Sequence, residues 1–403
     1  MKWLGFAYKN ARRNGRRSFV TILIAAMGTV AVLLSGGFAL YTYESLAQSA
    51  ARMTGHLILG KPEQFTQDEE KPLQNGLSDW KKMASELLVD PDVRAALPSV
   101  SFSGLVSNGD KSTVMIGLGV APDSEFKVKG PFLKMLEGHV LTGAEDGAQV
   151  MLGDGLARSL KARPGLPLTL LSSTTDGAMN ALDVTVTGIF TTGVTEVDKR
   201  MLYMDLPSAQ RLLNSDKVST VGVFLDSIEK TAFARQRLSA SYPSLTVRTW
   251  EEEATFYQSV RALYNRIFGA LGLVIGLIVA AVVANVMAMS IVERTREIGT
   301  LRAIGTSPSQ LNLSFAIEGT LLGFVGVVLG CAIALAASVL LYLLPIQMPP
   351  PPGRSTGYPL NINIDFSLYL ATSLAMVALA CMTSALVARK TVRMPIVQAL
   401  SHN

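Results

Sequence analysis

The sequence predicts a membrane α-helical protein: four transmembrane helices per protomer, with a large α+β extracytoplasmic domain between helices 1 and 2. Of its 403 residues, 49% are hydrophobic and only 17% are charged, whereas about a quarter of a soluble domain is usually charged. The hydrophobic residues gather in four runs, each long enough to cross a bilayer at about 1.5 Å of helix rise per residue. The polar stretch 44–266 separates the first run from the second.

These runs divide the chain into segments. In order, they are an amphipathic segment 1–17, a first span 18–43, the extracytoplasmic domain with its stalk helices 44–266, a second span 267–292, a short charged helix 293–310, a third span 311–344, a proline-rich loop 345–365, a fourth span 366–388 and a tail 389–403. A cleavable signal peptide is the alternative for the N-terminal run. Because its hydrophobic core would be about 7–15 residues long, the longer run 18–43 favours an uncleaved span.

Basic residues predict the orientation of the spans. Six of them precede the first span, three follow the second span within the charged helix, and three follow the fourth span, but the loop between spans three and four holds only Arg354. Loops rich in Lys and Arg stay in the cytoplasm. Both termini and the charged helix are therefore expected to be cytoplasmic, and the large domain and the proline-rich loop, with its run Pro349–Pro352, to lie on the other side.

The polar domain alternates strand-like and helical segments, which favours an α+β fold of two subdomains. The segments expected as strands are His56–Leu59, Thr113–Leu118, Leu168–Leu171, Val184–Phe190, Leu202–Met204, Val221–Leu225 and Leu245–Arg248, and those expected as helices are Ser78–Leu88, Gly155–Ala162 and Ser208–Leu213. The polar stretch Gln64–Asn75 is expected to be a loop.

Two stalk helices are expected to connect this domain to the spans. Residues 44–53 continue the first span as a helix. Before the second span, Phe256, Val260 and Leu263 recur at helical spacing within the segment Trp250–Asn265. No Pro or Gly interrupts this segment before the second span, so it is expected to be one continuous helix.

The charged segment 293–310 is expected to be a short amphipathic helix. Glu293, Arg296 and Glu297 fall on one face, and Ile291, Thr295, Ile298 and Leu301 fall on the opposite face. Gly305 and Pro308 are residues that typically end a helix. The alternative is a solvated loop with ordinary ion pairs. If the segment is a docking helix for another protein, its candidate contact residues are Glu293, Arg294, Arg296, Glu297 and Arg302.

Glycine pairs in two spans are candidate helix-packing sites. Gly272 with Gly276 in the second span, and Gly319 with Gly323 in the third, have the small-xxx-small spacing that lets helix backbones approach closely. They are candidates for a subunit interface, although glycine is also common in membrane helices generally.

The sequence lacks the usual patterns of catalytic and cofactor sites. It contains no G-x-x-x-x-G-K-[ST], H-E-x-x-H or G-x-S-x-G motif. Cys331 and Cys381 lie inside hydrophobic runs and are expected to pack there, and the three histidines, at positions 56, 139 and 402, are expected to be surface or core residues. Because the basic residues flank the spans, nucleic acid is not an expected partner. We expect neither enzymatic activity nor a cofactor on this chain.

Three stretches resemble a known family. Val292–Gly305, Val150–Leu160 and Val184–Gly193 are similar to permease subunits of ABC transporters of the MacB/FtsX/LolC-LolE type, in the coupling helix and the periplasmic core domain. The resemblance implies a protein of the bacterial inner membrane with two permease protomers, in a homo- or heterodimer. It also implies two copies of a separate ATPase subunit, which binds ATP and Mg, because no ATPase domain is present on this chain. Movement would then pass from the charged helix along the second span and its stalk, with Phe256, Val260 and Leu263 as the transmitting residues.

The resemblance leaves several functions open. The leading hypothesis is that ATP hydrolysis on the partner moves the periplasmic domains and so extracts a lipidic or lipoprotein cargo from the membrane lipid. The alternatives are MacB-like efflux of peptides or drugs with a periplasmic adaptor or carrier, and FtsX-like regulation of a cell-wall hydrolase without transport. A simple membrane-anchored receptor would not explain four spans and a charged helix.

Overall fold

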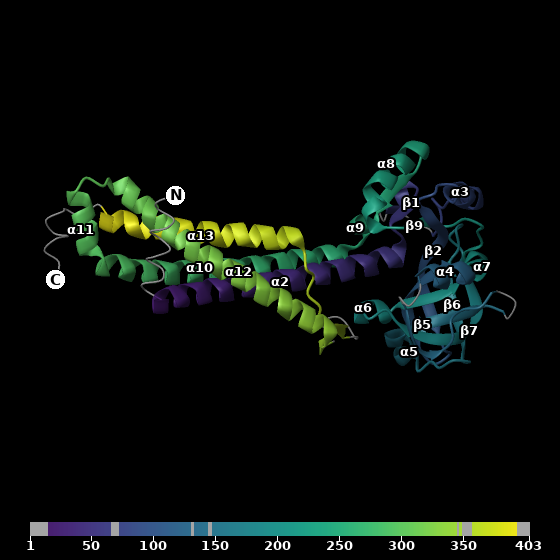
Figure 1. The fold of residues 1–403 in the computed structure, drawn as a ribbon. Helices are drawn as coiled ribbons and strands as arrows, with labels where there is room; N and C mark the ends of the chain where they lie inside the picture. The colour runs from purple at the N-terminus through teal and green to yellow at the C-terminus, as the bar shows by residue number, and fades with distance from the viewer. Residues whose placement is uncertain are drawn as a thin grey trace. The chain divides into compact units, whose positions relative to one another are not determined.

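The computed structural model describes residues 15–65, 72–129, 133–143, 147–344, 346–348 and 357–392 (Figure 1). The chain divides into two compact units. The membrane unit comprises 1–44, 260–347 and 359–403, and the sheet unit comprises 45–259 with 348–358. Most of the segment 1–17, part of the predicted loop Gln64–Asn75, the proline run Pro349–Pro352 and the tail beyond 392 lie outside the described residues.

Among the described residues, four helices are long and apolar enough to span a membrane, so the four-span prediction is confirmed. They are α2 (Gly15–Thr54), α10 (Thr255–Glu293), α12 (Pro308–Leu343) and α13 (Phe366–Val392). As predicted, α2 continues well beyond its hydrophobic run. Its 40 residues form one helix that enters both units.

The predicted stalk is one continuous helix from Thr255 into the second span, as expected, but its first residues are separate. A four-residue helix, α9 (Trp250–Glu253), is separated from α10 by Ala254, whose ψ of 64° is not helical. A capping box between Thr249 and Glu252 begins α9 as a helix of its own, which periodicity alone cannot reveal. In α10, Val260 is half-buried and Leu263 is 54% exposed. The side chain of Phe256 lies outside the described part of the chain.

The glycines of α12 pack against helices of the same chain. A Cβ at Gly319 would lie 1.9 Å from Ser384 Oγ of α13, and a Cβ at Gly323 would lie 2.6 Å from Ala380 Cβ. The prediction that Gly319 and Gly323 pack closely against a helix is therefore confirmed, but that helix is α13 of the same chain and not a second subunit. Around Gly272 and Gly276 of α10, no described atom lies within 4 Å of such a Cβ.

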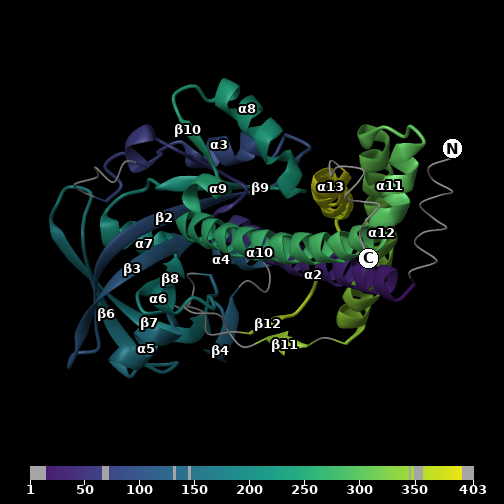
Figure 2. The ribbon, with the colours of Figure 1, turned by 90° about the vertical axis from the view of Figure 1, so that its left-hand side faces the viewer.

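The sheet unit contains one ten-stranded sheet, in the order β10-β1-β9-β2-β3-β8-β5-β7-β4, with β6 paired to β2 and β7 (Figure 2). The strands are β1 (Leu57–Gly60), β2 (Val93–Ser107), β3 (Ser112–Val120), β4 (Lys134–Gly138), β5 (Gln149–Gly153), β6 (Pro167–Ser173), β7 (Met179–Thr191), β8 (Met201–Asp205), β9 (Thr220–Leu225) and β10 (Thr246–Thr249). A separate two-stranded sheet is formed by β11 (Gln347–Met348) and β12 (Tyr358–Pro359).

The expected division into two subdomains is not found, because the long strand β2 joins both halves of the sheet. Its first part, Val93–Ser99, pairs with β9, and its second part, Ser99–Ser107, pairs with β3. The sequence analysis missed this strand, since Pro98 and four serines interrupt its hydrophobic pattern. The seven strands that were expected are all present, with shifted ends.

The main core of the sheet unit lies on one face of this sheet. Side chains such as Val100, Met115 and Val223 pack there with residues of several helices. Those helices are α3 (Trp80–Leu87), α5 (Asp154–Leu160), α7 (Leu206–Leu213) and α8 (Thr231–Ser241); α4 (Pro122–Lys129) contributes Phe126 and Val128 to smaller clusters, and α6 (Thr195–Asp198), η1 (Pro62–Phe65) and η4 (Ile228–Lys230) are single turns.

Candidate functional site

The charged segment forms a helix shorter than expected, α11 (Thr295–Ala303). It does not begin at residue 293, because α10 continues to Glu293 and the chain then turns at Arg294, with φ −108° and ψ 11°. The Thr295 hydroxyl donates to the carbonyl oxygens of Ile291 (3.2 Å) and Val292 (2.8 Å). These hydrogen bonds satisfy carbonyls at the end of α10 and stabilise the corner.

The other end of α11 is fixed by Gly305, as the sequence predicts. Gly305 has φ +100°, a conformation that favours glycine. The amides of Gly305 and Thr306 donate to the carbonyls of Arg302 (3.1 Å) and Leu301 (3.0 Å), which is a Schellman motif. Pro308 then begins α12, where Ser307 and Gln310 form a capping box.

The apolar face of α11 is packed against three other helices. Ile298 is buried in a cluster with Ile291 of α10, Leu311 and Phe315 of α12 and Ala388 of α13. Ile291, Thr295 and Ile298 are buried and Leu301 is half-buried, so the predicted apolar face is confirmed. A displacement of α11 therefore acts directly on α10, α12 and α13.

A buried ion pair joins the corner before α11 to the third span. Arg294 Nη1 lies 3.3 Å from Glu318 Oε2, and their side chains are only 7% and 6% exposed. Arg294 Nε also lies 3.3 Å from Glu297 Oε2, and the guanidinium lies 5.7 Å from the centre of the Phe315 ring. Placing Arg294 among the docking residues was therefore wrong, since its side chain points into the protein. Glu318 was visible in the sequence as the one acidic residue in the third hydrophobic run.

The opposite face of α11 is accessible. Glu293, Arg296 and Glu297 are exposed, as the helical spacing predicts, and Arg302 is half-buried. Glu293 is the last residue of α10 and the other three belong to α11; we call these four residues the α11 surface. Ile304, at the end of the helix, is 75% exposed. A short helix that is anchored on one face and carries charges of both signs on the other is suited to receiving a protein partner.

The described residues show no candidate metal site. No group of three or more His, Cys, Asp or Glu residues among them could hold a metal ion. His56 is partly buried, and its Nδ1 accepts a hydrogen bond from the Leu225 amide (3.0 Å). Burial lowers its pKa, as expected for a core histidine.

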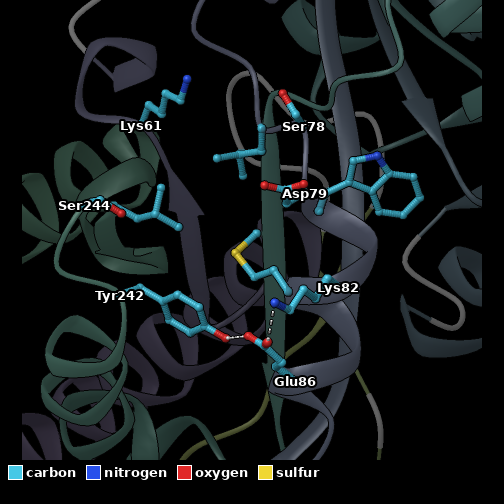
Figure 3. Close-up of a pocket in the computed structure, with 11 residues that line it drawn as sticks. Lys61, Ser78, Asp79, Lys82, Glu86, Tyr242 and Ser244 are labelled. Carbon is cyan, nitrogen blue, oxygen red and sulfur yellow. Dashed lines mark hydrogen bonds and ion pairs between the residues drawn. The ribbon is translucent and has the colours of Figure 1, made fainter.

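A pocket of about 410 Å³ lies in the sheet unit between α3 and the end of α8 (Figure 3). Across it, the Tyr242 hydroxyl donates to Glu86 Oε2 (3.1 Å), and Lys82 Nζ lies 3.9 Å from Glu86 Oε1. Burial and Glu86 raise the pKa of Tyr242. The raised pKa keeps the Tyr242 hydroxyl protonated, so its contact with Glu86 does not make it an activated nucleophile.

Comparison with known proteins covers both units. The model of the MacB-like periplasmic core domain matches residues 18–241, and that of the FtsX-like permease C-terminal domain matches residues 269–396. The "Lipoprotein-releasing system transmembrane protein LolC" of Xylella fastidiosa is 25% identical over 81% of this chain and 79% of its own length.

Two further similar proteins carry the name MacB. The "Macrolide export ATP-binding/permease protein MacB" of Rhodopirellula baltica is 26% identical over 91% of this chain and 58% of its own length. The crystal structure of the periplasmic region of MacB from Actinobacillus actinomycetemcomitans is 14% identical, with a TM-score of 0.34, over 52% of this chain and 95% of that one.

Proposed function

Because the chain belongs to the ABC transporter permeases of the LolC/LolE/MacB type, with a MacB-like periplasmic core domain and an FtsX-like permease domain, we propose that a separate ATPase docks on its α11 surface. The observation that carries this proposal is that one face of α11 is buried and the opposite face is exposed. The buried face packs against three membrane helices, and the exposed face presents Arg296 and Glu297, beside Glu293 at the end of α10, to a partner.

The proposed complex contains two permease protomers and two ATPase subunits. ATP and Mg bind to the ATPase, and this chain performs no chemistry on them. The α11 surface lies in the cytoplasm together with both termini, which the distribution of basic residues supports. When ATP closes the ATPase dimer, the push on α11 passes into the long helices α2 and α10, which enter the sheet unit in the periplasm.

The proposed cargo is a lipid or lipoprotein in the inner membrane. The similarity to LolC over most of both chains supports this class. The similarity to MacB over 91% of this chain favours export of a small amphiphile with a periplasmic adaptor as the second candidate. Mass spectrometry of the purified permease–ATPase complex should find bound lipid or lipidated protein under the first reading, and an adaptor protein under the second.

Charge reversal on the α11 surface is expected to prevent ATPase binding. Glu293→Lys and Arg296→Glu each place a charge against the partner's complementary group, and we expect at least about tenfold weaker binding, which corresponds to about 1.4 kcal/mol. Glu297 is not suitable for this test because it also contacts Arg294. The measurement is the amount of ATPase that co-purifies with the permease from detergent-solubilised membranes.

Glu196→Lys is the matched control, because Glu196 is exposed in the sheet unit and its change should leave binding intact. Unchanged co-purification of the ATPase with both α11 variants would reject docking at this surface.

A further inference from the structure

The first span, α2, is held tightly by the third span. A Cβ at Gly326 of α12 would lie 2.6 Å from Ala25 Cβ, and one at Gly330 would lie 2.7 Å from Thr29 Cβ. Ala25 and Thr29 are both buried in α2. Since α12 is in turn joined to the α11 corner by Arg294 and Glu318, a movement of α11 shifts α12 and α2 together.

The chain that follows α2 forms a strand inside the sheet, with a neighbour on each side. Only Gly55 and His56 separate Thr54, the last residue of α2, from β1, which lies between β9 and β10. Gly55 has φ +98°, a backbone conformation that favours glycine, so the connection from α2 to β1 depends on this residue. On β9, a Cβ at Gly222 would lie 2.5 Å from the Thr54 carbonyl oxygen. The end of α2 therefore rests directly on the sheet backbone.

A buried ion pair fixes this junction. Lys129 of α4 donates from Nζ to the Met53 carbonyl oxygen (2.6 Å), and the same ammonium is paired with Glu125. The side chains of Lys129 and Glu125 are only 10% and 3% exposed. A cation at this position satisfies an open carbonyl and interacts favourably with the dipole of a 40-residue helix.

The connection of α10 to the sheet is different. It leads through Ala254 and the short helix α9 to β10, a strand at the edge of the sheet. A change of direction at Ala254 absorbs movement that a continuous helix would transmit. The sequence analysis placed transmission in this segment, at Phe256, Val260 and Leu263.

We propose that α2, rather than α10, carries the ATPase stroke into the periplasmic sheet, and that Lys129 and Glu125 are the positioning residues that make its junction with β1 and β9 rigid. This inference rests on the proposed ATPase coupling. It assigns Lys129 a role in transmission and none in binding cargo or nucleotide.

The test uses the permease–ATPase complex in lipid nanodiscs and measures hydrogen exchange of the amides in β1 and β9, without nucleotide and with ATP and vanadate. The wild type should show a nucleotide-dependent change in these strands. The double variant Lys129→Met/Glu125→Gln removes the pair without leaving a buried unpaired charge. It should lose most of that change, while its ATPase rate stays within about twofold of the wild type and its exchange without nucleotide is unaltered in β5 and β7.

Two matched variants separate transmission from a general loss of structure. Lys129→Arg keeps the cationic donor and should therefore show the same nucleotide-dependent change in hydrogen exchange as the wild type. Thr249→Ala removes the capping box on the α10 side and should also retain it. If the double variant keeps the nucleotide-dependent change, or if Thr249→Ala abolishes it, the assignment to α2 is wrong. A wild-type complex that shows no change in the sheet unit would overturn the proposed coupling as well.

Discussion

Arg294→Met is expected to destabilise the membrane unit by about 3–5 kcal/mol, because it breaks a buried ion pair with Glu318. Glu318 is buried, and Arg294 Nη1 donates a hydrogen bond to its carboxylate. The same substitution removes the guanidinium from the Phe315 ring and from Glu297. The corner between α10 and α11 should therefore loosen, and less ATPase should co-purify with this variant.

The double variant Arg294→Met/Glu318→Leu tests the cause. Because it replaces the buried pair with two apolar side chains, we expect it to recover most of the lost stability. Arg296→Met is the control, since Arg296 is an exposed arginine on the same helix and its change should be nearly neutral. Thermal unfolding in detergent measures the stability of each variant, and we expect Arg294→Met to unfold at the lowest temperature. If the double variant were as unstable as Arg294→Met, the broken pair with the buried carboxylate would not be the cause of the lost stability.

Gly319→Val is expected to have the second large effect, because it forces α12 away from α13. The first added carbon would lie 1.9 Å from Ser384 Oγ and 3.3 Å from the Ala380 carbonyl oxygen, so neither helix can keep its place. Overpacking of this kind typically costs about 1–3 kcal/mol and sometimes more. The expected result is a lower unfolding temperature and a smaller yield of folded protein.

Gly272→Val is the matched control, as it makes the same change in the same kind of motif. The described chain has no atom within 4 Å of a Cβ at Gly272, so folding of the protomer should be unaffected. Equal losses of stability for Gly272→Val and Gly319→Val would show that the α12–α13 contact is not what makes position 319 sensitive.

Periodicity predicted the parts of the site that depend on one helix alone. It identified the buried face with Ile298 and the exposed face with Arg296, and it placed the end of α11 at Gly305. It could not find the turn at Arg294, since that turn depends on a hydrogen bond from the Thr295 hydroxyl and on a partner 24 residues away, Glu318.

The fold shows the same limit. The four spans follow from hydrophobicity and length, which are local properties. The different surroundings of Gly319 and Gly272 do not follow from local properties. The two motifs are alike in sequence, but α13 packs against Gly319 and no such contact is present at Gly272 among the described residues. The bridging strand β2 was missed for the same reason, as its serines are placed by pairing with β3 and β9.

The most direct test of the account is crosslinking from the α11 surface to the ATPase. A cysteine introduced as Thr300→Cys, at an exposed position of α11, should link to the ATPase through a short thiol-reactive crosslinker, and ATP should alter the yield. Cys331 and Cys381 would first be replaced by alanine. We expect no link to the ATPase from Ser103→Cys, an exposed position in the sheet unit. A Thr300→Cys protein that reacts with a soluble thiol reagent but never links to the ATPase would contradict the claim that α11 receives the stroke.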